Sequence, residues 1–393
     1  MHMYKPFLLA LLLAGKLYGQ DVTRLHEKAV VVDSHNDILT ACIEKQVSMD
    51  ADLRGKTQSD LSRFKQGGVD VQMFSVWCDG NKPDPFGWAN REMDTLYAVA
   101  GRNPDKIVIV KSWKELQQAI RQKKLAAMFG VEGGHMISND LQHLEQLYNR
   151  GMRYMTLTWN NSTSWATSAM DESTKKDSLA ATHKGLTDFG KEVVRKMNEL
   201  GVIVDVSHVG EQTFWDVIAT STKPVIASHS NVYPLCPVFR NLKDDQIRAI
   251  AKNGGVIQLN FFSGFVDSNF QQKEKAFMAR HKTEIDSLKR AGMQYEYAVT
   301  TIMNQYPAEA TAARPTLDML LQHLDYIVHQ AGVDHVGLGS DFDGISSSPQ
   351  QLDDVTSYPV ITQALLKRGY SKRDVKKILG GNFLRVLKAN LRS

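Results

Sequence analysis

The sequence is poor in cysteine, has no long basic run and lacks a glycine-rich phosphate-binding motif. Its 393 residues include three cysteines, Cys42, Cys78 and Cys236. Three cysteines cannot form a disulfide framework, and these lack the close spacing of a thiolate metal site. The net charge is only +4, with no basic stretch that would indicate nucleic-acid binding. No GxGxxG motif follows the first predicted strand, which argues against a dinucleotide-binding fold.

Linkers, internal repeats and low-complexity tracts are missing as well. No segment rich in proline, glycine and serine divides the chain, whereas hydrophobic residues make up 42% of it. This hydrophobic share excludes a disordered chain, because it suffices for a buried core. The length suits one large α/β domain or two ordinary ones, since a barrel can exceed about 250 residues as a single domain.

An apolar run lies close to the N-terminus. Lys5 precedes the run Phe7–Ala14, and small or polar residues follow it, which is the order of a secretory signal peptide. The run is too short for a bilayer span, which needs about 20 apolar residues. A buried N-terminal helix is the less favoured alternative, because no acidic residue occurs before Asp21. We expect residues 1–20 to be a signal peptide, and residues 21–393 to form one domain of an exported protein, periplasmic or secreted, without a stable membrane anchor.

The rest of the chain alternates between short apolar runs and segments of helical periodicity. Eight runs are predicted strands: Ala29–Asp33, Val69–Trp77, Leu125–Val131, Arg153–Thr158, Val202–Ser207, Pro224–Ser228, Gly255–Asn260 and Val336–Ser340. A further run, Ile107–Val110, is a candidate accessory strand. Seven segments are predicted helices: Glu92–Gly101, Trp113–Gln122, Leu141–Tyr148, Thr187–Leu200, Glu211–Ala219, Asp245–Lys252 and Leu317–Gln330. This alternation indicates an α/β fold with parallel strands, most economically a closed (β/α)8 TIM barrel, with an open doubly wound sheet as the alternative.

A charged, helix-prone segment, residues 267–314, separates the seventh and eighth predicted strands. Its composition predicts a helical insertion in the barrel and not an independent domain. An inserted lid and a plain solvated excursion are both compatible with it.

Ionisable residues recur where the predicted strands end, which is where a parallel barrel carries its functional groups. Five of the eight strand ends have a histidine or a carboxylate. They are Asp-Ser-His-Asn-Asp at 33–37, Glu-Gly-Gly-His at 132–135, Asp-Val-Ser-His at 205–208, Ser-His-Ser at 228–230 and Ser-Asp-Phe-Asp-Gly at 340–344. Each such charge would cost several kcal/mol if it were buried without a partner, and a metal centre removes that cost.

The residue types indicate the kind of metal. Neutral imidazole and carboxylate ligands without thiolates suit Zn²⁺ or a similar first-row ion. The donors are too many for one open catalytic zinc and match two ions about 3.5–4 Å apart, bridged by a carboxylate and a water. This water would lose a proton near neutral pH and become the nucleophile, and Asp341 would be free to act as general base and acid.

Six motifs carry a family resemblance. They are Val-Asp-Ser-His-Asn-Asp at 32–37, Gly-Val-Glu-Gly-Gly-His at 130–135, Asp-Val-Ser-His at 205–208, Ser-His-Ser at 228–230, Phe-Arg-Asn at 239–241 and Gly-Ser-Asp-Phe-Asp-Gly at 339–344. In this order and spacing the chain resembles an exported bacterial member of the membrane (renal) dipeptidase family, which are binuclear zinc peptidases on a (β/α)8 barrel. The similarity runs from about Val30 to about Leu387 and includes Gly-Asn-Phe-Leu-Arg-Val at 381–386.

The resemblance implies a zinc-dependent dipeptidase that tolerates a D-residue at the C-terminal position of the dipeptide. It implies two zinc ions per chain, the first on His35 and Asp37, the second on His208 and His229, with Glu132 bridging them. It further implies that Arg240 binds the substrate's α-carboxylate, a role that suits a planar guanidinium. Asp341 would shuttle a proton near the substrate amine and the leaving group. The family often forms dimers, although the sequence itself has no interface signature.

One position departs from the family pattern. Many members carry, after the fourth strand, a histidine that contacts the reacting carbonyl, whereas this chain has Trp159. Indole has one N–H donor and cannot accept a proton. Oxyanion stabilisation would then rest on the zinc ions, on Trp159 or on a neighbour such as Asn160. The departure favours altered substrates over a dead enzyme, and it keeps open another metal-dependent amide, ester or lactone hydrolase. The intact zinc ligands argue against a non-catalytic binding protein.

Five other residues near the strand ends have weaker assignments. We expect His135 to pack behind Glu132, and Asp343 to organise its loop without ligating a metal. Trp77 could equally line the pocket or belong to the core. Asp33 and Asp205 could orient His35 and His208, or make buried structural hydrogen bonds.

Overall fold

The computed structural model of the protein describes residues 19–175, 184–293 and 295–391. The predicted signal peptide lies outside this range except for its last two residues. Within the described ranges no helix is long and apolar enough to cross a membrane.

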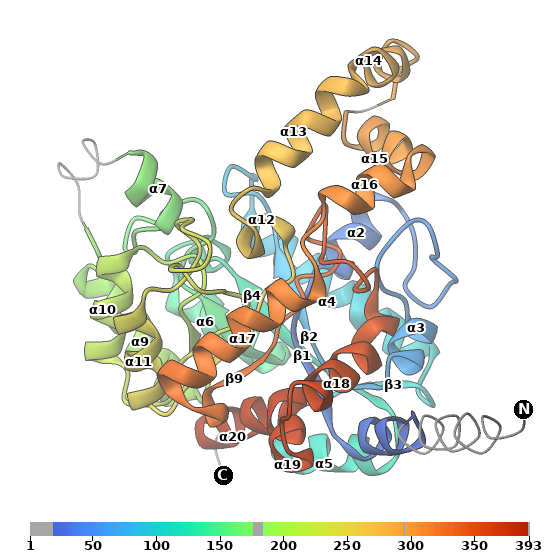
Figure 1. Ribbon diagram of the computed structural model, residues 1–393. Coiled ribbons are helices and arrows are strands. Elements are labelled where there is room, and N and C mark those ends of the chain that lie inside the picture. The colour runs from blue at the N-terminus through green and yellow to red at the C-terminus, as the bar shows by residue number, and fades with distance from the viewer. Residues whose placement is uncertain (1–18, 176–183, 294, 392–393) are drawn as a thin grey trace, which may run out of the picture.

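Eight parallel strands form a nearly closed barrel, and helices surround it (Figure 1). The strand order is β1-β2-β4-β5-β6-β7-β8-β9, and β3 joins β4 outside this path. The strands are β1 Val31–Asn36, β2 Val69–Trp77, β3 Ile107–Ile109, β4 Leu125–Glu132, β5 Met152–Thr156, β6 Ile203–Asp205, β7 Ile226–Ala227, β8 Val256–Leu259 and β9 Val336–Leu338. The predicted (β/α)8 TIM barrel is therefore confirmed, as is the accessory strand.

The first and last strands of the barrel meet through a few contacts just beyond β9. Asn36 and Phe342 form a parallel bridge, and the Asp341 N–H donates to the His35 carbonyl over 3.1 Å. Strand β1 extends three residues beyond its predicted end at Asp33, because an irregular register lets Asn36 pair with Phe74 of β2. His35 consequently lies inside the strand and not after it.

Each of the seven predicted helices is present, with shifts at its ends. The helices of the barrel are α2 Ile38–Glu44, α3 Leu61–Gln66, α4 Pro85–Arg102, α5 Trp113–Arg121, α6 Leu141–Arg150, α7 Ala169–Thr174, α9 Asp188–Leu200, α10 Glu211–Thr220, α11 Asp244–Lys252, α17 Leu317–Ala331, α18 Tyr358–Lys367, α19 Lys372–Lys376 and α20 Asn382–Asn390. The largest shift is in α4, where the Asp84 side chain caps Gly87 N–H and Pro85 takes the first helical position.

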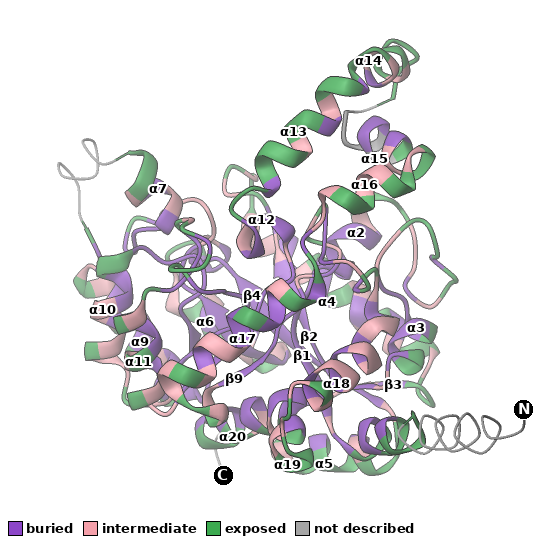
Figure 2. Ribbon diagram, in the orientation of Figure 1, coloured by how far each residue is buried: buried purple, intermediate pink, exposed green. Residues whose placement is uncertain are grey.

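The N-terminal half of the barrel interior is filled by an apolar group that we call the floor cluster. It consists of Val32, Val71, Met73, Ala126, Met128, Ile203, Ile226 and Val256 from the strands, and Phe383, Val386 and Leu387 from α20, and Tyr154 of β5 packs in the same apolar cluster. All of them are buried, as the purple interior of Figure 2 shows. Because the strand members stand mostly near strand starts, the floor cluster closes the end of the barrel opposite the functional mouth.

The segment between β8 and β9 forms a helical arm that projects from the barrel (Figure 1). Its helices are α12 Ser263–Val266, α13 Phe270–Arg280, α14 Lys282–Arg290, α15 Tyr295–Gln305 and α16 Pro307–Ala313. Phe277, Ile285 and Ile302 belong to a small apolar cluster of the arm's own. Of the described residues of α13 to α16, only Gln271 lines the cavity at the barrel mouth. The arm is therefore closer to a solvated excursion than to a lid.

Candidate active site

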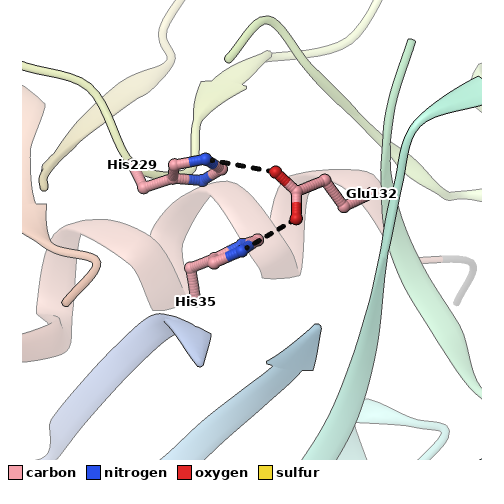
Figure 3. Close-up of side chains that lie close together, drawn as sticks. All are labelled: His35, Glu132 and His229. Carbon is pink, nitrogen blue, oxygen red and sulfur yellow. Dashed lines mark ion pairs between the residues drawn. The ribbon is translucent and has the colours of Figure 1, made fainter. Parts of the chain in front are cut away.

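Three histidines surround one glutamate at the carboxyl ends of the strands. Glu132 ends β4, His35 lies on β1, and His208 and His229 follow β6 and β7. Glu132 Oε1 lies 2.8 Å from His208 Nε2 and 3.5 Å from His229 Nε2, while Oε2 lies 3.3 Å from His35 Nε2. Figure 3 shows His35 and His229 directed at opposite oxygens of the carboxylate. The glutamate thus joins two groups of imidazoles, as the sequence predicted.

Two aspartates complete the group on the His35 side. Asp37 Oδ2 lies 3.4 Å from His35 Nε2, and Asp341 Oδ1 lies 4.0 Å from it. His35, Asp37 and Asp341 could hold a metal ion together, and so could His35, Glu132 and His229. All the residues predicted to bind metal are therefore close together at one mouth of the barrel.

The three imidazoles are held by their Nδ1 atoms. Tyr154 Oη lies 2.8 Å from His35 Nδ1, Ser228 Oγ 2.8 Å from His229 Nδ1, and Asn160 Oδ1 3.2 Å from His208 Nδ1. An imidazole whose Nδ1–H donates to an oxygen presents the Nε2 lone pair, which is the form that binds a metal. Each histidine is thereby fixed with Nε2 toward Glu132.

Tyr154 reaches His35 across the interior of the barrel from β5. Its hydroxyl donates to the Ser34 carbonyl over 3.0 Å, so it accepts from His35 Nδ1–H. Burial raises the pKa of Tyr154 far above its usual range, which keeps this proton on the hydroxyl. A Cβ at Gly130 would overlap the tyrosine ring at 1.9 Å, so the strand beside the ring needs glycine there. The sequence analysis missed Tyr154; the available signal was a tyrosine hydroxyl in a fully buried strand.

Asp205 acts on a different histidine from the one expected. Its carboxylate accepts from the Ser228 hydroxyl over 2.6 Å, and Ser228 in turn accepts from His229. It also accepts from Ser207 N–H and Ser228 N–H. Asp205 therefore orients His229 and not His208, because the Ser228 hydroxyl stands between the two groups.

Burial and neighbouring charges set the protonation of these groups. Burial lowers the pKa of His208 to about 4 and holds the pKa of His229 well below its usual value. Burial alone would raise the pKa of Glu132, but without a bound cation a protonated His35 and the adjacent histidines hold it well below normal, and a metal ion would take the place of that positive charge. Two neutral imidazoles beside an ionised carboxylate are the ligand forms that Zn²⁺ takes.

The donor geometry fits a bound cation. His35 Nε2 is buried without a hydrogen-bond partner. The Nε2 atoms of His208 and His229 lie 2.9 Å apart, although both rings already have Nδ1 engaged with an oxygen. Two lone pairs facing each other at this distance repel unless a positive charge lies beside them. The site therefore has the chemistry of a metal centre.

Arg240 lines the same mouth and is buried. Its guanidinium lies 3.4 Å from Ser230 Oγ and donates to the His229 carbonyl over 3.2 Å, while Nε has no partner. Among the described residues no carboxylate comes within ion-pair distance of it. Burial lowers the pKa of Arg240 to about 10, so it remains charged at neutral pH. A buried cation without a carboxylate partner is suited to an anionic ligand.

Asp341 is fixed at the edge of this group. Its Oδ2 accepts from Asn260 Nδ2 over 2.8 Å, and its backbone adopts a left-handed φ of 62°. Burial raises the pKa of Asp341 well above its usual value, aided by the negative charges of Asp37 and Glu132. His208 has a similar φ of 63°. Such conformations cost about 1–3 kcal/mol and concentrate at functional sites.

Two tryptophans form one wall of the mouth. The rings of Trp77 and Trp159 meet edge to face with centroids 5.0 Å apart, and both line the cavity. Asn160 lines it too, although its side-chain oxygen is occupied by His208. The structure thus places Trp77 in the pocket and gives Asn160 a contact with a predicted ligand that the sequence did not suggest.

The remaining candidates hold the surrounding loops. His135 Nε2 lies 3.0 Å from the Cys78 carbonyl, behind Glu132 as expected. Asp33 accepts from Ser340 N–H and Oγ, and from His35 only through the backbone N–H. Asp343 accepts from Gln58 N–H over 2.6 Å and from the Ser59 hydroxyl, so it organises its loop.

Asp37, Glu132, His208, Arg240 and Asp341 line a cavity of about 1500 Å³. It exceeds the usual size of small-molecule sites, about 300–1,000 Å³. Its lining combines the polar group around Glu132 with aromatic and aliphatic side chains from the loops that follow β5, β7 and β8. The cavity can therefore take a small polar ligand together with a bulky apolar substituent.

Comparison with known proteins agrees with this geometry. The probable dipeptidase PvdM from Pseudomonas aeruginosa is 24% identical with a TM-score of 0.75, and the match covers 95% of this chain and 98% of that one. A metallo peptidase from Rhodobacter sphaeroides, solved with a phosphinate mimic of L-Ala-D-Ala, is 23% identical with a TM-score of 0.71, and the match covers 92% and 99%. At these identities the likeness establishes the fold. The model of the membrane dipeptidase family (peptidase family M19) matches residues 20–392. The chain therefore belongs to the membrane dipeptidase family and is a metallo-dipeptidase.

Proposed function

We propose that the protein is a zinc-dependent dipeptidase acting on free dipeptides, including those with a D-residue at the C-terminal position. The observation that carries the proposal is the buried Glu132 carboxylate among three imidazole Nε2 atoms, in one cavity with the Arg240 guanidinium, which has no carboxylate partner among the described residues. The bound L-Ala-D-Ala mimic in the Rhodobacter sphaeroides relative supports a substrate of this kind.

Five residues would hold two zinc ions. His35 and Asp37 form one half of the site, His208 and His229 form the other, and Glu132 contributes one oxygen to each half. Zinc bound in such a site polarises a carbonyl group and lowers the pKa of water to about 7. The chain contributes the orientation of the ligands, through Tyr154, Ser228 and Asn160 on the three Nδ1 atoms.

The charged ends of a dipeptide have partners in the cavity. The Arg240 guanidinium would bind the α-carboxylate in a charge-assisted hydrogen bond. A longer peptide would place an uncharged amide at this position, which explains a preference for dipeptides. Asp341 would bind the substrate amine and transfer a proton to the leaving group, since its carboxylate is held at the edge of the metal ligands by Asn260.

Trp159 is the residue that supports a second candidate function, hydrolysis of a substrate other than a dipeptide. The indole N–H is the only polar group that this side chain can offer a reacting carbonyl. A substrate other than a dipeptide, such as another amide, an ester or a lactone, would suit a site with weaker oxyanion stabilisation on this side. Loss of one oxyanion donor costs about 10²–10³ in rate.

Arg240→Ala with Arg240→Lys as the matched variant tests the assignment. We expect Arg240→Ala to raise KM for L-Ala-D-Ala and L-Ala-L-Ala about 10²-fold, because a charge-assisted hydrogen bond is lost, and Arg240→Lys to recover part of it. KM for the methyl ester of the same dipeptide should rise much less. An equal rise for dipeptide and ester would overturn the assignment of Arg240.

A substrate panel on metal-loaded wild-type protein separates the candidate functions. Two zinc ions per chain with dipeptide hydrolysis supports the dipeptidase. Two zinc ions with hydrolysis of esters or lactones but of no dipeptide would replace it with the second candidate. A protein that binds no metal would be a binding protein only.

Export and dimerisation are separate parts of the proposal. The charged start and apolar run within residues 1–20 support export to the periplasm or beyond the cell. Intact mass of the protein expressed with its own N-terminus should show the loss of about these residues, and an unprocessed N-terminus would contradict export. Sedimentation velocity tests whether the chain forms the homodimer common in its family.

A further inference from the structure

Large apolar side chains are exposed beside Arg240. Among the described residues the exposed large hydrophobic side chains are Tyr233, Leu235, Phe239 and Met293, with exposures of 36% to 41%. Three of these four lie on the loop between β7 and α11, which also carries Arg240. Tyr233 and Phe239 line the cavity, whereas Leu235 does not. Exposed aromatic side chains at a cavity mouth indicate a surface that an apolar group covers.

A second pair of aromatic rings continues this surface inward. Phe265 lies under the Arg240 guanidinium at 5.3 Å, and Phe262 meets Phe265 edge to face at 4.9 Å. Both rings are partly exposed and line the cavity. We call Tyr233, Phe239, Phe262 and Phe265 the apolar wall. The wall comes from two segments, the loop after β7 and the start of α12 after β8, with Arg240 between them.

We propose that the apolar wall selects dipeptides whose C-terminal residue has a large apolar side chain. The inference rests on the proposed function, since it takes Arg240 as the partner of the substrate's α-carboxylate. In the C-terminal residue of a dipeptide, the side chain and the carboxylate branch from the same carbon atom. A carboxylate at Arg240 therefore brings this side chain close to the wall.

The size of the effect follows from the area covered. Apolar surface removed from water contributes about 25 cal/mol per Å², so a benzyl group against the wall favours binding where a hydrogen atom does not. Part of the cavity volume beyond the polar group is then used by the side chain of the substrate. In a hydrophobic pocket a single methylene group discriminates by about 10–200-fold, so a benzyl group against this partly exposed wall should reach at least the lower end of that range.

A second copy of the chain is the competing occupant. Phe262 and Phe265 are less exposed than Tyr233 and Phe239, and they line the same cavity as Asp37, Glu132 and His208. A flat partner surface would reach Tyr233, Leu235 and Phe239 but would not need the inner rings. The continuity of the wall from Arg240 inward favours the substrate.

Selectivity kinetics with a control in the same loop test the inference. The measured quantity is the ratio of kcat/KM for Ala-Phe to kcat/KM for Ala-Gly, with both L- and D-Phe. We expect a ratio above about 10 in the wild type. It should fall at least about fivefold in Phe239→Ala and in Phe262→Ala, which lie on different loops, and stay unchanged in Leu235→Ala. Thermal melting of each variant checks that it folds.

Different results would overturn the proposed selectivity and the proposed function. A wild-type ratio near one, or an equal fall in Leu235→Ala, would overturn the selectivity while leaving dipeptide hydrolysis intact. A dimer that dissociates in both Leu235→Ala and Phe239→Ala, with the ratio unchanged, would assign the surface to a second copy. Absence of hydrolysis of both dipeptides by metal-loaded protein would overturn the proposed function and this inference together.

Discussion

The mouth of the barrel buries three histidines around a glutamate, whereas the floor cluster at the other end buries only apolar side chains. Both ends are built from the same strands. At the floor, burial of hydrocarbon stabilises the fold at about 25 cal/mol per Å². At the mouth, burial of charge opposes folding, and the opposing cost is relieved only by partners or a bound cation.

The backbone shows the same contrast. His208 and Asp341 have left-handed φ angles at the mouth. Hydrogen bonds such as that from Thr158 Oγ1 to the His208 carbonyl hold the backbone in this conformation. Val71, Met73, Ala126 and Met128 of the floor cluster lie in the uninterrupted parallel pairing of β2 with β4. We infer that the free energy gained by apolar packing at the floor offsets the cost of strained backbone and buried charge at the mouth.

Glu132→Gln should disrupt the proposed metal site at the barrel mouth, and it should have the largest effect on activity of the substitutions considered. The amide cannot serve as an anionic ligand for both halves of the site, so we expect both metal ions to be lost and kcat/KM to fall at least about 10³-fold. The metal-free protein should unfold at the same or a higher denaturant concentration than metal-free wild type, because a buried charge is removed. Metal analysis, kinetics and urea unfolding measure the three quantities.

Asp343→Asn is the matched control for Glu132→Gln, because Asp343 lies at the same mouth but organises a loop. It should keep both metal ions. Loss of metal in this variant, or retention of metal in Glu132→Gln, would contradict the assignment of ligands.

Phe383→Ala should instead disrupt packing in the floor cluster and lower the stability of the fold. Removal of a fully buried ring from α20 leaves a cavity and should lower the free energy of unfolding by about 3–5 kcal/mol. The number of bound metal ions and kcat/KM at 25 °C should stay close to wild type, since Phe383 lies on α20 and does not line the cavity at the mouth. A variant that folds with normal stability but loses metal would refute the separation of the two ends.

Tyr154→Phe probes the connection between barrel interior and mouth. Without the hydroxyl, His35 Nδ1 loses its acceptor, and we expect metal affinity to fall about 10–100-fold. Competition against a chelator measures the affinity independently of catalysis. Tyr97→Phe, which removes a hydroxyl bonded to the Arg150 carbonyl away from the mouth, should leave the affinity unchanged. Equal effects of the two substitutions would show that Tyr154 is merely structural.

The smallest expected effect is on the pH dependence of the free energy of unfolding, and it comes from Asp70 at the start of β2. Burial raises the pKa of Asp70 to about 6, so the folded state binds this proton more tightly than the unfolded state does. Its favourable contribution is complete below the ordinary pKa near 3.9 and is lost as the pH rises through about 6. Asp70→Asn can keep the hydrogen bond from Val31 N–H and should gain about 1–2 kcal/mol over wild type at pH 8, and little at pH 4. Urea unfolding at both pH values tests this, and an equal gain at both would contradict it.

The gathering of these side chains at the mouth could be predicted from sequence because ionisable residues at the ends of apolar strands have few structural explanations, and their role as metal ligands stays a prediction. Arg240 and Trp159 were found by comparison with the family motifs, whereas Asp341 also followed from its place at the end of a predicted strand. The orientation of the ligands could not be predicted, because it depends on how far Tyr154 and Ser228 reach across the barrel. Asp205 was expected either to orient His208 or to make a buried structural hydrogen bond, whereas it reaches His229 through Ser228.

The positions of the loops at the mouth and the helix at the C-terminal end of the chain were also not predicted. The apolar wall combines Phe239 and Phe262 from loops without periodicity, so only the fold shows that they are neighbours of Arg240. Helix α20 was not predicted, although its Phe383 closes the floor. The end of β1 was misplaced because an irregular register carries Asn36 into the barrel.

The central claim is that the mouth holds a two-zinc dipeptidase site, and a titration of metal-free protein with Zn²⁺ tests it most directly. Hydrolysis of L-Ala-D-Ala is followed at each addition, together with the amount of bound zinc. The account predicts that the rate reaches its maximum at two zinc ions per chain. A maximum at one ion, or zinc binding without any dipeptide hydrolysis, would contradict it.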